Sequence, residues 1–269
     1  MSLKAPLKIG LAGLGAVGRE VAKRLLAGIP GLKLAAVSAR DHKKARQIAP
    51  DQAIKILDAK EISEACDVIV EGLPPAEFRN FALPAIERGK IFVPLSVGKL
   101  LENWDLVEKA RESGARILVP TGALLGLDAV RAAAEGTIHS VKMVTRKPPE
   151  GLEGAAYLVE RKISVAGLKE PLKIFDGSAR EGARGFPANV NVAAALSLAG
   201  IGPDKTRLEI WADPTVSRNT HRIDVDADTV RFSMTIENIP SENPRTGKVV
   251  ALSVVAQLRG LVSELKVGT

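Results

Sequence analysis

Cysteine and aromatic residues are scarce in this sequence. Cys66 is the single cysteine among 269 residues, which excludes an intrachain disulfide framework and favours a reducing compartment. Because Cys66 stands where an apolar segment begins, we interpret it as a packing residue rather than a nucleophile. Phe, Trp and Tyr together make up 3% of the chain, too few for the stacking platform that binds nucleic-acid bases.

Long apolar runs and long runs of one charge are also missing. No stretch approaches the roughly 20 apolar residues that span a bilayer, and residues 1–6 lack a signal-peptide core. We therefore expect a cytoplasmic protein with no membrane partner. The net charge is +7, from 38 Lys and Arg against 31 Asp and Glu. Since these charges are interspersed, an anionic small molecule is favoured and no nucleic-acid partner is expected.

What the sequence does contain, near its beginning, is a strand, a glycine turn and a helix in succession. The apolar run 7–12 precedes three glycines in the spacing GxGxxG, and apolar residues recur at helical spacing over 19–26. In dinucleotide-binding folds the first glycine makes the tight turn, the second lets a pyrophosphate approach, and the third lets helix pack on strand. Here these are Gly13, Gly15 and Gly18.

The start of that helix is the expected anion site. Free backbone amides at Ala16 and Val17, together with the helix dipole, favour negative charge there. The pattern predicts a dinucleotide-binding turn, with a merely structural glycine turn as the alternative.

The residues after the second expected strand, 32–37, bear on which dinucleotide binds. An acidic residue about 20 positions beyond the glycines binds the ribose 2′-hydroxyl of NAD, whereas a nearby Arg accommodates the 2′-phosphate of NADP. Ser38 and Arg40 stand at this point, which favours NADP. In the alternative, Arg40 is solvated and Asp41 binds the ribose. The predicted cofactor is NAD or NADP, and no metal is predicted.

Strand and helix signals alternate through the first part of the chain. Apolar runs at 53–57, 65–71, 91–98 and 115–120 are separated by helical patterns at 77–87 and 104–113. This alternation predicts a Rossmann-type, doubly wound parallel sheet over residues 1–121. Ligands of such sheets bind beyond the carboxyl ends of the strands, where we expect the loops 72–75, 96–99 and 121–126.

After about residue 127 the periodicity changes. Alternation with period two at 137–145, 206–212 and 230–237 predicts a second α+β domain over 122–242, with a mainly antiparallel sheet. A free face of this sheet favours a homodimer.

Helices are expected in this second part at 128–135 and from Asn191, as N-cap, to Gly200. A last helix starting at Asn243 and Pro244 is expected to return to the first domain, which then includes 243–269.

These segments resemble the L-aspartate dehydrogenase family over nearly the whole length of the chain. The sequence departs from the family at Leu125, where glycine is frequent and where a larger side chain narrows the expected nicotinamide pocket. The segments that carry the resemblance are 120–128 (PTGALLGLD), 145–149 (TRKPP), 175–181 (FDGSARE), 186–194 (FPANVNVAA), 212–214 (ADP) and 219–221 (NTH).

The resemblance implies an NAD(P)-dependent enzyme that oxidises L-aspartate to iminoaspartate, which hydrolyses to oxaloacetate and ammonia. By analogy the product feeds NAD biosynthesis. The resemblance also implies that His221 is catalytic and that Ala123 and Asn191 contact the cofactor on its nicotinamide side. Asn189 is a further expected cofactor contact. Two alternatives are a related two-domain NAD(P)-dependent dehydrogenase and a dinucleotide-sensing protein without catalysis.

The residues themselves support part of this chemistry. His221 stands in a polar corner just before an expected strand, and an imidazole with a pKa near ~6.5 can accept the proton that the substrate ammonium must lose. A structural histidine is the alternative. A dicarboxylate substrate also needs cationic partners, and the candidates are Arg146, Lys147 and Arg180, each of which has a solvated surface role as its alternative.

Overall fold

The structure is a computed structural model that describes residues 5–187, 190–239, 241 and 247–268. The chain divides into two compact units. Unit 1 comprises Met1–Pro120 and Ala251–Lys266, and unit 2 comprises Thr121–Val250 and Val267–Thr269.

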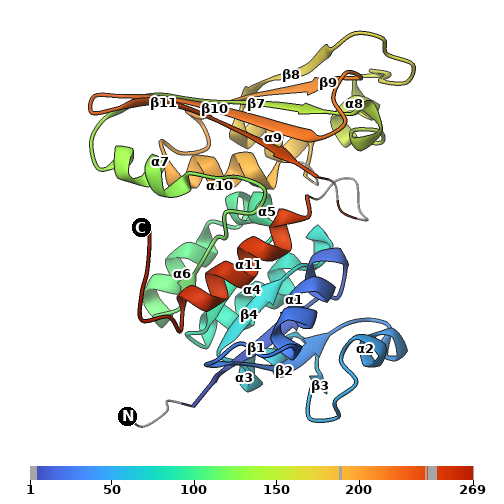
Figure 1. Ribbon diagram of the computed structural model, residues 1–269, viewed down its shortest axis with the longest axis vertical. Coiled ribbons are helices and arrows are strands. Elements are labelled where there is room, and N and C mark those ends of the chain that lie inside the picture. The colour runs from blue at the N-terminus through green and yellow to red at the C-terminus, as the bar shows by residue number, and fades with distance from the viewer. Residues whose placement is uncertain (1–4, 188–189, 240, 242–246, 269) are drawn as a thin grey trace. The chain divides into compact units, whose positions relative to one another are not determined.

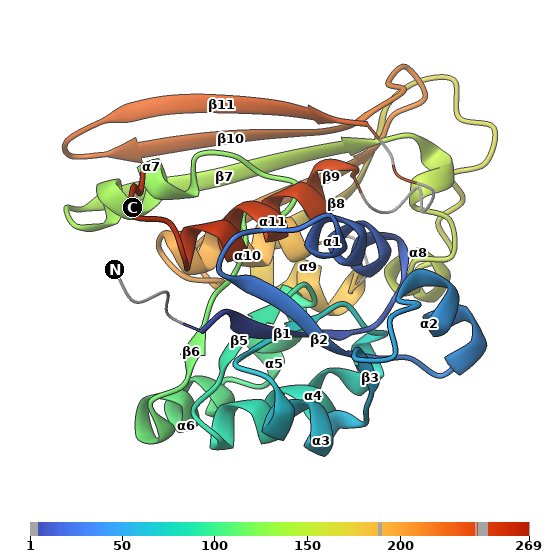
Figure 2. The ribbon, with the colours of Figure 1, turned by 60° about the horizontal axis from the view of Figure 1, so that its bottom comes forward.

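Unit 1 contains a parallel sheet with the strand order β3-β2-β1-β4-β5-β6. Figure 1 labels β1 to β4 of this sheet, and Figure 2 labels β5 and β6. The strand order reverses at β1, which pairs with both β2 and β4, so a topological switch point lies at the carboxyl end of β1. The predicted Rossmann-type sheet is confirmed. The strands are β1 (Leu7–Ala12), β2 (Leu32–Ser38), β3 (Lys55–Ile56), β4 (Val68–Glu71), β5 (Ile91–Pro94) and β6 (Arg116–Ile117).

The helices of unit 1 include three that the sequence analysis did not predict, namely α2, α3 and α5. Both α2 and α3 are short and begin at aspartate caps, Asp41 and Asp58. A helix, α5, begins where a loop was expected over 96–99, so Lys99 is helical and pairs with Glu102 at 2.6 Å. The helices are α1 (Ala16–Leu26), α2 (His42–Ile48), α3 (Ala59–Ala65), η1 (Pro75–Glu77), α4 (Phe78–Glu87), α5 (Val97–Glu102), α6 (Asp105–Ser113) and α11 (Val249–Gly260).

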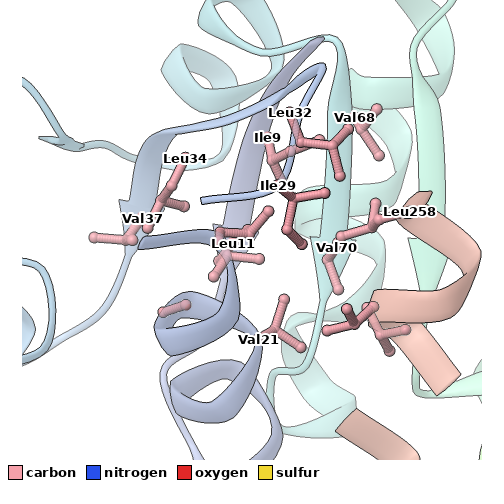
Figure 3. Close-up of a cluster of buried hydrophobic side chains, with 14 of the residues drawn as sticks. Ile9, Leu11, Val21, Ile29, Leu32, Leu34, Val37, Val68, Val70 and Leu258 are labelled. Carbon is pink, nitrogen blue, oxygen red and sulfur yellow. The ribbon is translucent and has the colours of Figure 1, made fainter. Parts of the chain in front are cut away.

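The core of unit 1 joins its first strands to the last helix of the chain. Figure 3 shows Leu11 of β1, Val21 of α1, Val70 of β4 and Leu258 of α11 around one buried cluster. Burial of these aliphatic side chains is the main force that holds α11 on unit 1. The expected start of this helix, at 243 and 244, lies outside the described residues.

Unit 2 contains a five-stranded sheet with the order β11-β10-β7-β9-β8 (Figure 2). β10 is antiparallel to both neighbours and β8 is antiparallel to β9, whereas β7 and β9 are parallel. The mainly antiparallel sheet is therefore confirmed. The strands are β7 (Ile138–Lys147), β8 (Leu172–Ser178), β9 (Arg207–Ala212), β10 (Asn219–Ala227) and β11 (Arg231–Asn238).

Helices of unit 2 cover one face of this sheet. α7, α9 and α10 lie together on that side in Figure 1. The other face is polar. Val190 is the N-cap of α10 and Asn191 is its first helical residue, so the predicted N-cap was one residue too late. The helices are α7 (Leu127–Ala134), η2 (Pro149–Gly151), α8 (Ala156–Glu160), α9 (Ala179–Gly185) and α10 (Asn191–Ala199).

In the parts of the chain that the structure describes, no helix combines the length and apolarity needed to span a bilayer.

Candidate active site

In the turn between β1 and α1, the space around each of the three glycines differs. Gly13 has φ +100, and a Cβ there would lie 2.6 Å from the carbonyl oxygen of Gly72. A Cβ on Gly18 would overlap the carbonyl oxygen of Gly13, because helix and turn pack directly on each other. Around Gly15, by contrast, a Cβ would meet no atom within 4 Å. The backbone is thus open at the one glycine where a ligand must approach.

The first turn of α1 fits the phosphates of a dinucleotide. Its N-cap, Gly15, offers no side-chain cap, and no acidic side chain lies in the turn. Ala16 and Val17 are half-buried at the start of the helix. Backbone amides at a helix N-terminus favour an anion, so these residues could hold a pyrophosphate.

At the end of β2, the acidic alternative for ribose binding is already engaged. The carboxylate of Asp41 accepts a hydrogen bond from Lys44 N at 3.0 Å and caps α2. Ser38 ends β2, and its carbonyl accepts from Gly13 N at 2.9 Å. Arg40 is exposed next to this edge. This arrangement favours the NADP interpretation, which stays a prediction.

Unit 2 buries a group of polar side chains at one end of the helix-covered face of its sheet. We call this group the polar cluster. Each of its members is between 2% and 4% exposed, in a layer whose buried residues are mostly apolar. Polar side chains so buried need partners, which marks this end of the sheet as chemically distinct. The cluster consists of Thr145, Lys147, Asn219, His221 and Asn238.

His221 is central to the polar cluster. It is the third residue of β10, inside the strand rather than before it as expected, and pairs in register with Thr145 of β7. The Oγ1 of Thr145 lies 3.1 Å from its Nδ1. Burial, and secondarily the charge of Lys147, lower the pKa of His221 to about 3. The pKa of His221 is therefore far below the neutral range that we expected, and its imidazole is neutral at pH 7.

Lys147 is the cationic candidate that the structure brings to His221. It ends β7 and, two residues beyond Thr145, shares the same face of the sheet. Its buried position and its effect on the pKa of His221 place a positive charge beside the imidazole. Such a charge suits a carboxylate.

The structure does not bring Arg146 and Arg180 to this cluster. Arg146 projects from the opposite face of β7, where it donates to Asp213 at 2.9 Å and lies 4.6 Å above the ring of Trp211. Arg180 is the second residue of α9, at the other end of the sheet, and binds Asp204 through two nitrogens, at 2.6 and 2.9 Å. Their expected role as carboxylate partners therefore gains no support.

Asn238 was missed by the sequence analysis. Its Nδ2 donates to the carbonyl of Ala123 at 2.9 Å and so joins the end of β11 to the turn 121–126. Ala123, one of the expected cofactor contacts, is buried there, whereas Leu125 is exposed. Asn191 is half-buried at the start of α10, and Asn189 lies outside the described residues. In the sequence, Asn238 looks like any other asparagine at the end of a strand. Its hydrogen bond to Ala123 distinguishes it, and that contact is visible only in the structure.

Comparisons with known proteins cover both units. Residues 13–120 match the family model described as "Homoserine dehydrogenase, NAD binding domain", and residues 128–261 match "Aspartate dehydrogenase, C-terminal". The sequence is 56% identical to an L-aspartate dehydrogenase of Bradyrhizobium diazoefficiens over 98% of this chain and 94% of the relative. The chain belongs to the L-aspartate dehydrogenase family.

Further similarities in this family agree over the full length. An enzyme of Bordetella bronchiseptica named L-aspartate dehydrogenase 3 is 52% identical, with 100% of both chains covered. The crystal structure of aspartate dehydrogenase from Thermotoga maritima has a TM-score of 0.78 at 22% identity, over 97% of this chain and 99% of that one. It shares the fold. Unit 1 is accordingly an NAD(P)-binding domain.

Proposed function

We propose that the chain oxidises L-aspartate to iminoaspartate with NAD(P)⁺ as the acceptor, and that iminoaspartate then hydrolyses to oxaloacetate and ammonia. Family membership over both units supports the reaction class. The observation that carries the mechanism is the buried pair of His221 and Lys147 on one sheet face.

The cofactor would be held by the glycine turn and the start of α1. The open backbone at Gly15 and the uncapped first turn, with Ala16, Val17 and Gly18, fit its phosphates. Once bound, the dinucleotide accepts the hydride that leaves the α-carbon of the substrate. Ser38 and Arg40 would contact the ribose end, with Arg40 suited to a 2′-phosphate.

His221 acts in this proposal as the base. The hydride can leave only when the substrate nitrogen offers its lone pair, so the ammonium must first lose a proton. If Nδ1 carries the ring proton and donates it to Thr145, Nε2 is left to accept the substrate proton. After Nε2 has released this proton to solvent, it can take a proton from the water that attacks the imine.

Lys147 has two roles in the proposal. Its ammonium holds one carboxylate of the substrate. The negative charge of that carboxylate in turn offsets the effect of the Lys147 charge on the pKa of His221. Because this charge is one of the two causes that lower the pKa of His221, a substrate carboxylate bound to Lys147 raises that pKa. The base therefore becomes stronger when substrate is present.

We also propose that the protein is a homodimer and that it is cytoplasmic, like the NAD(P) pool that it uses. Its basis is the polar face of the unit 2 sheet. This face carries ion pairs such as Lys142 of β7 with Glu209 of β9 at 2.9 Å, and Arg222 with Asp224, both of β10, at 2.9 Å. Sedimentation equilibrium with the wild type and a Trp211→Glu variant tests this surface. A dimer that becomes a monomer in the variant is expected, and a wild-type monomer rejects the assembly.

The reaction is tested by steady-state reduction of each dinucleotide with aspartate and with other amino acids. Aspartate is expected to give the highest kcat/KM. Turnover of a different substrate class would favour the related dehydrogenase, and dinucleotide binding without turnover of any substrate would favour the sensing protein.

A further inference from the structure

Glu71 is a fully buried carboxylate that the proposed reaction does not use. It is the last residue of β4 and is 0% exposed. Its Oε1 accepts hydrogen bonds from Leu73 N at 2.9 Å and from Ser96 Oγ at 3.0 Å, and its Oε2 accepts from Ser96 N at 3.1 Å. One side chain thus joins the loop after β4 to the loop after β5.

Such a carboxylate is costly to bury. Removing it from water disfavours the charged form, which raises the pKa of Glu71. An apolar side chain at the end of β4 would continue the Val-Ile-Val run of that strand without this cost. The three hydrogen-bond donors offset part of this penalty only while they stay in place around the carboxylate. The same hydrogen bonds therefore hold the loops after β4 and β5, and this is the contribution of Glu71.

The loop after β4, which Glu71 holds through Leu73, packs directly against the glycine turn. Gly72 N donates to the carbonyl of Ala12 at 2.8 Å. The carbonyl of Gly72 lies 2.6 Å from the position that a Cβ on Gly13 would take. The turn and the loop are thus in direct backbone contact, and a shift of Gly72 displaces Gly13.

We infer that Glu71 is a positioning residue for the dinucleotide site: it fixes the loops after β4 and β5 against the glycine turn before cofactor binds. The inference rests on the proposed binding of NAD(P) at this turn. A loop that is already ordered loses less conformational freedom on binding, so preorganisation increases affinity. Glu71 acts through Leu73, Ser96 and Gly72 rather than by contact with the cofactor.

The test is the variant Glu71→Gln, which keeps the size of the side chain but replaces one acceptor oxygen by an NH₂ group. In either orientation that group faces a backbone N–H, of Leu73 or of Ser96. We expect the Kd for NADH and NADPH, measured by calorimetry, to rise about tenfold. In the cofactor-free protein, the amides of Leu73 and Ser96 should exchange hydrogen faster.

Asp67→Asn is the matched control. Asp67 precedes the same strand at its other end and accepts from Lys8 N at 2.8 Å, so it also joins two segments through a carboxylate. Its replacement should leave both Kd values within about twofold. If both variants weaken binding equally, the effect is general destabilisation and the inference is overturned.

Ser96→Ala provides the second variant in case Glu71→Gln does not fold. It removes the hydroxyl donor but leaves the carboxylate and both backbone donors, so a rise in Kd of about threefold is expected. Unchanged Kd and unchanged amide exchange in the folded variants would overturn the inference. If the wild type binds neither dinucleotide, the proposed function fails, and the exchange rates of Leu73 and Ser96 then decide whether Glu71 orders the loops.

Discussion

The hydroxyl of Thr145 lies 3.1 Å from Nδ1 of His221, across the paired strands β7 and β10. Both side chains are buried, so this contact is isolated from competing water. It fixes the rotation of the imidazole and, if Nδ1 is the donor, selects the tautomer in which Nε2 accepts a proton. The pairing register of two strands thus determines which nitrogen is available for chemistry.

Thr145→Val removes that hydroxyl with little change in size. We expect kcat to fall about tenfold, because the ring loses its partner and its preferred tautomer, while the Kd for dinucleotide stays constant. Thr145→Ser restores the hydroxyl and should recover most of the loss. Steady-state kinetics beside calorimetry measures both, and equal kcat in wild type and Thr145→Val would show that the contact is not used.

Lys147→Met removes the buried charge beside His221. We expect the KM for aspartate to rise at least tenfold, because a carboxylate loses its ionic partner. The pKa of His221 should rise above about 3 but stay below its ordinary value, since burial is the larger cause of its depression. NMR titration of the histidine ring follows the second effect.

Arg146→Gln is the control for Lys147→Met. Arg146 neighbours Lys147 in sequence but lies on the other face of the sheet, over Trp211. The aspartate KM of this variant should remain within about threefold of the wild type. If the KM for aspartate rises more in Arg146→Gln than in Lys147→Met, the substrate binds on the face of the sheet that carries Arg146, and the proposed role of Lys147 is contradicted.

Stability should depend on pH through His221. Its pKa is lowered to about 3 in the folded chain, whereas an unfolded chain protonates near ~6.5. The unfolded state therefore binds the extra proton between these values. The contribution of the neutral ring to stability is present above pH ~6.5 and is lost as pH falls toward about 3, by about 1.4 kcal/mol per pH unit.

Urea unfolding of wild type and His221→Gln over this range separates the effect from that of the carboxylates, which both proteins share. The free energy of unfolding should fall less steeply with decreasing pH in the variant. Parallel curves would mean that His221 is not buried in the neutral form.

Arg40→Ala tests the choice of cofactor. With the carboxylate of Asp41 engaged as a helix cap, Arg40 is the residue near the end of β2 suited to a 2′-phosphate. The KM for NADP⁺ should rise about tenfold and the KM for NAD⁺ should change little. If both change alike, Arg40 does not distinguish the two dinucleotides.

Features set by local sequence were largely predictable. The strand, glycine turn and helix from residue 7 to residue 26 follow from periodicity and glycine spacing, and the structure places them as expected. The antiparallel strand β11 follows from alternation. Short helices such as α2 and α3 were missed because seven residues hold too few apolar positions to show a period.

Features set by strand pairing could not be predicted. Arg146 and Lys147 are adjacent in sequence and equally basic, yet alternation along β7 puts them on opposite faces. Only the register of β7 with β10 shows that Lys147 shares the face of His221. Likewise, nothing local indicates that Asn238 contacts Ala123 or that Glu71 joins two loops, because these contacts span 115 and 25 residues.

The central claim is that His221 is the base in aspartate oxidation. The most direct test assays His221→Ala beside the wild type for aspartate-dependent formation of NAD(P)H. The Kd for dinucleotide is measured on the same samples. The account predicts wild-type turnover, a loss of about 10²-fold to 10⁴-fold in kcat for the variant, and Kd values within about twofold. Turnover by His221→Ala at the wild-type rate would contradict it.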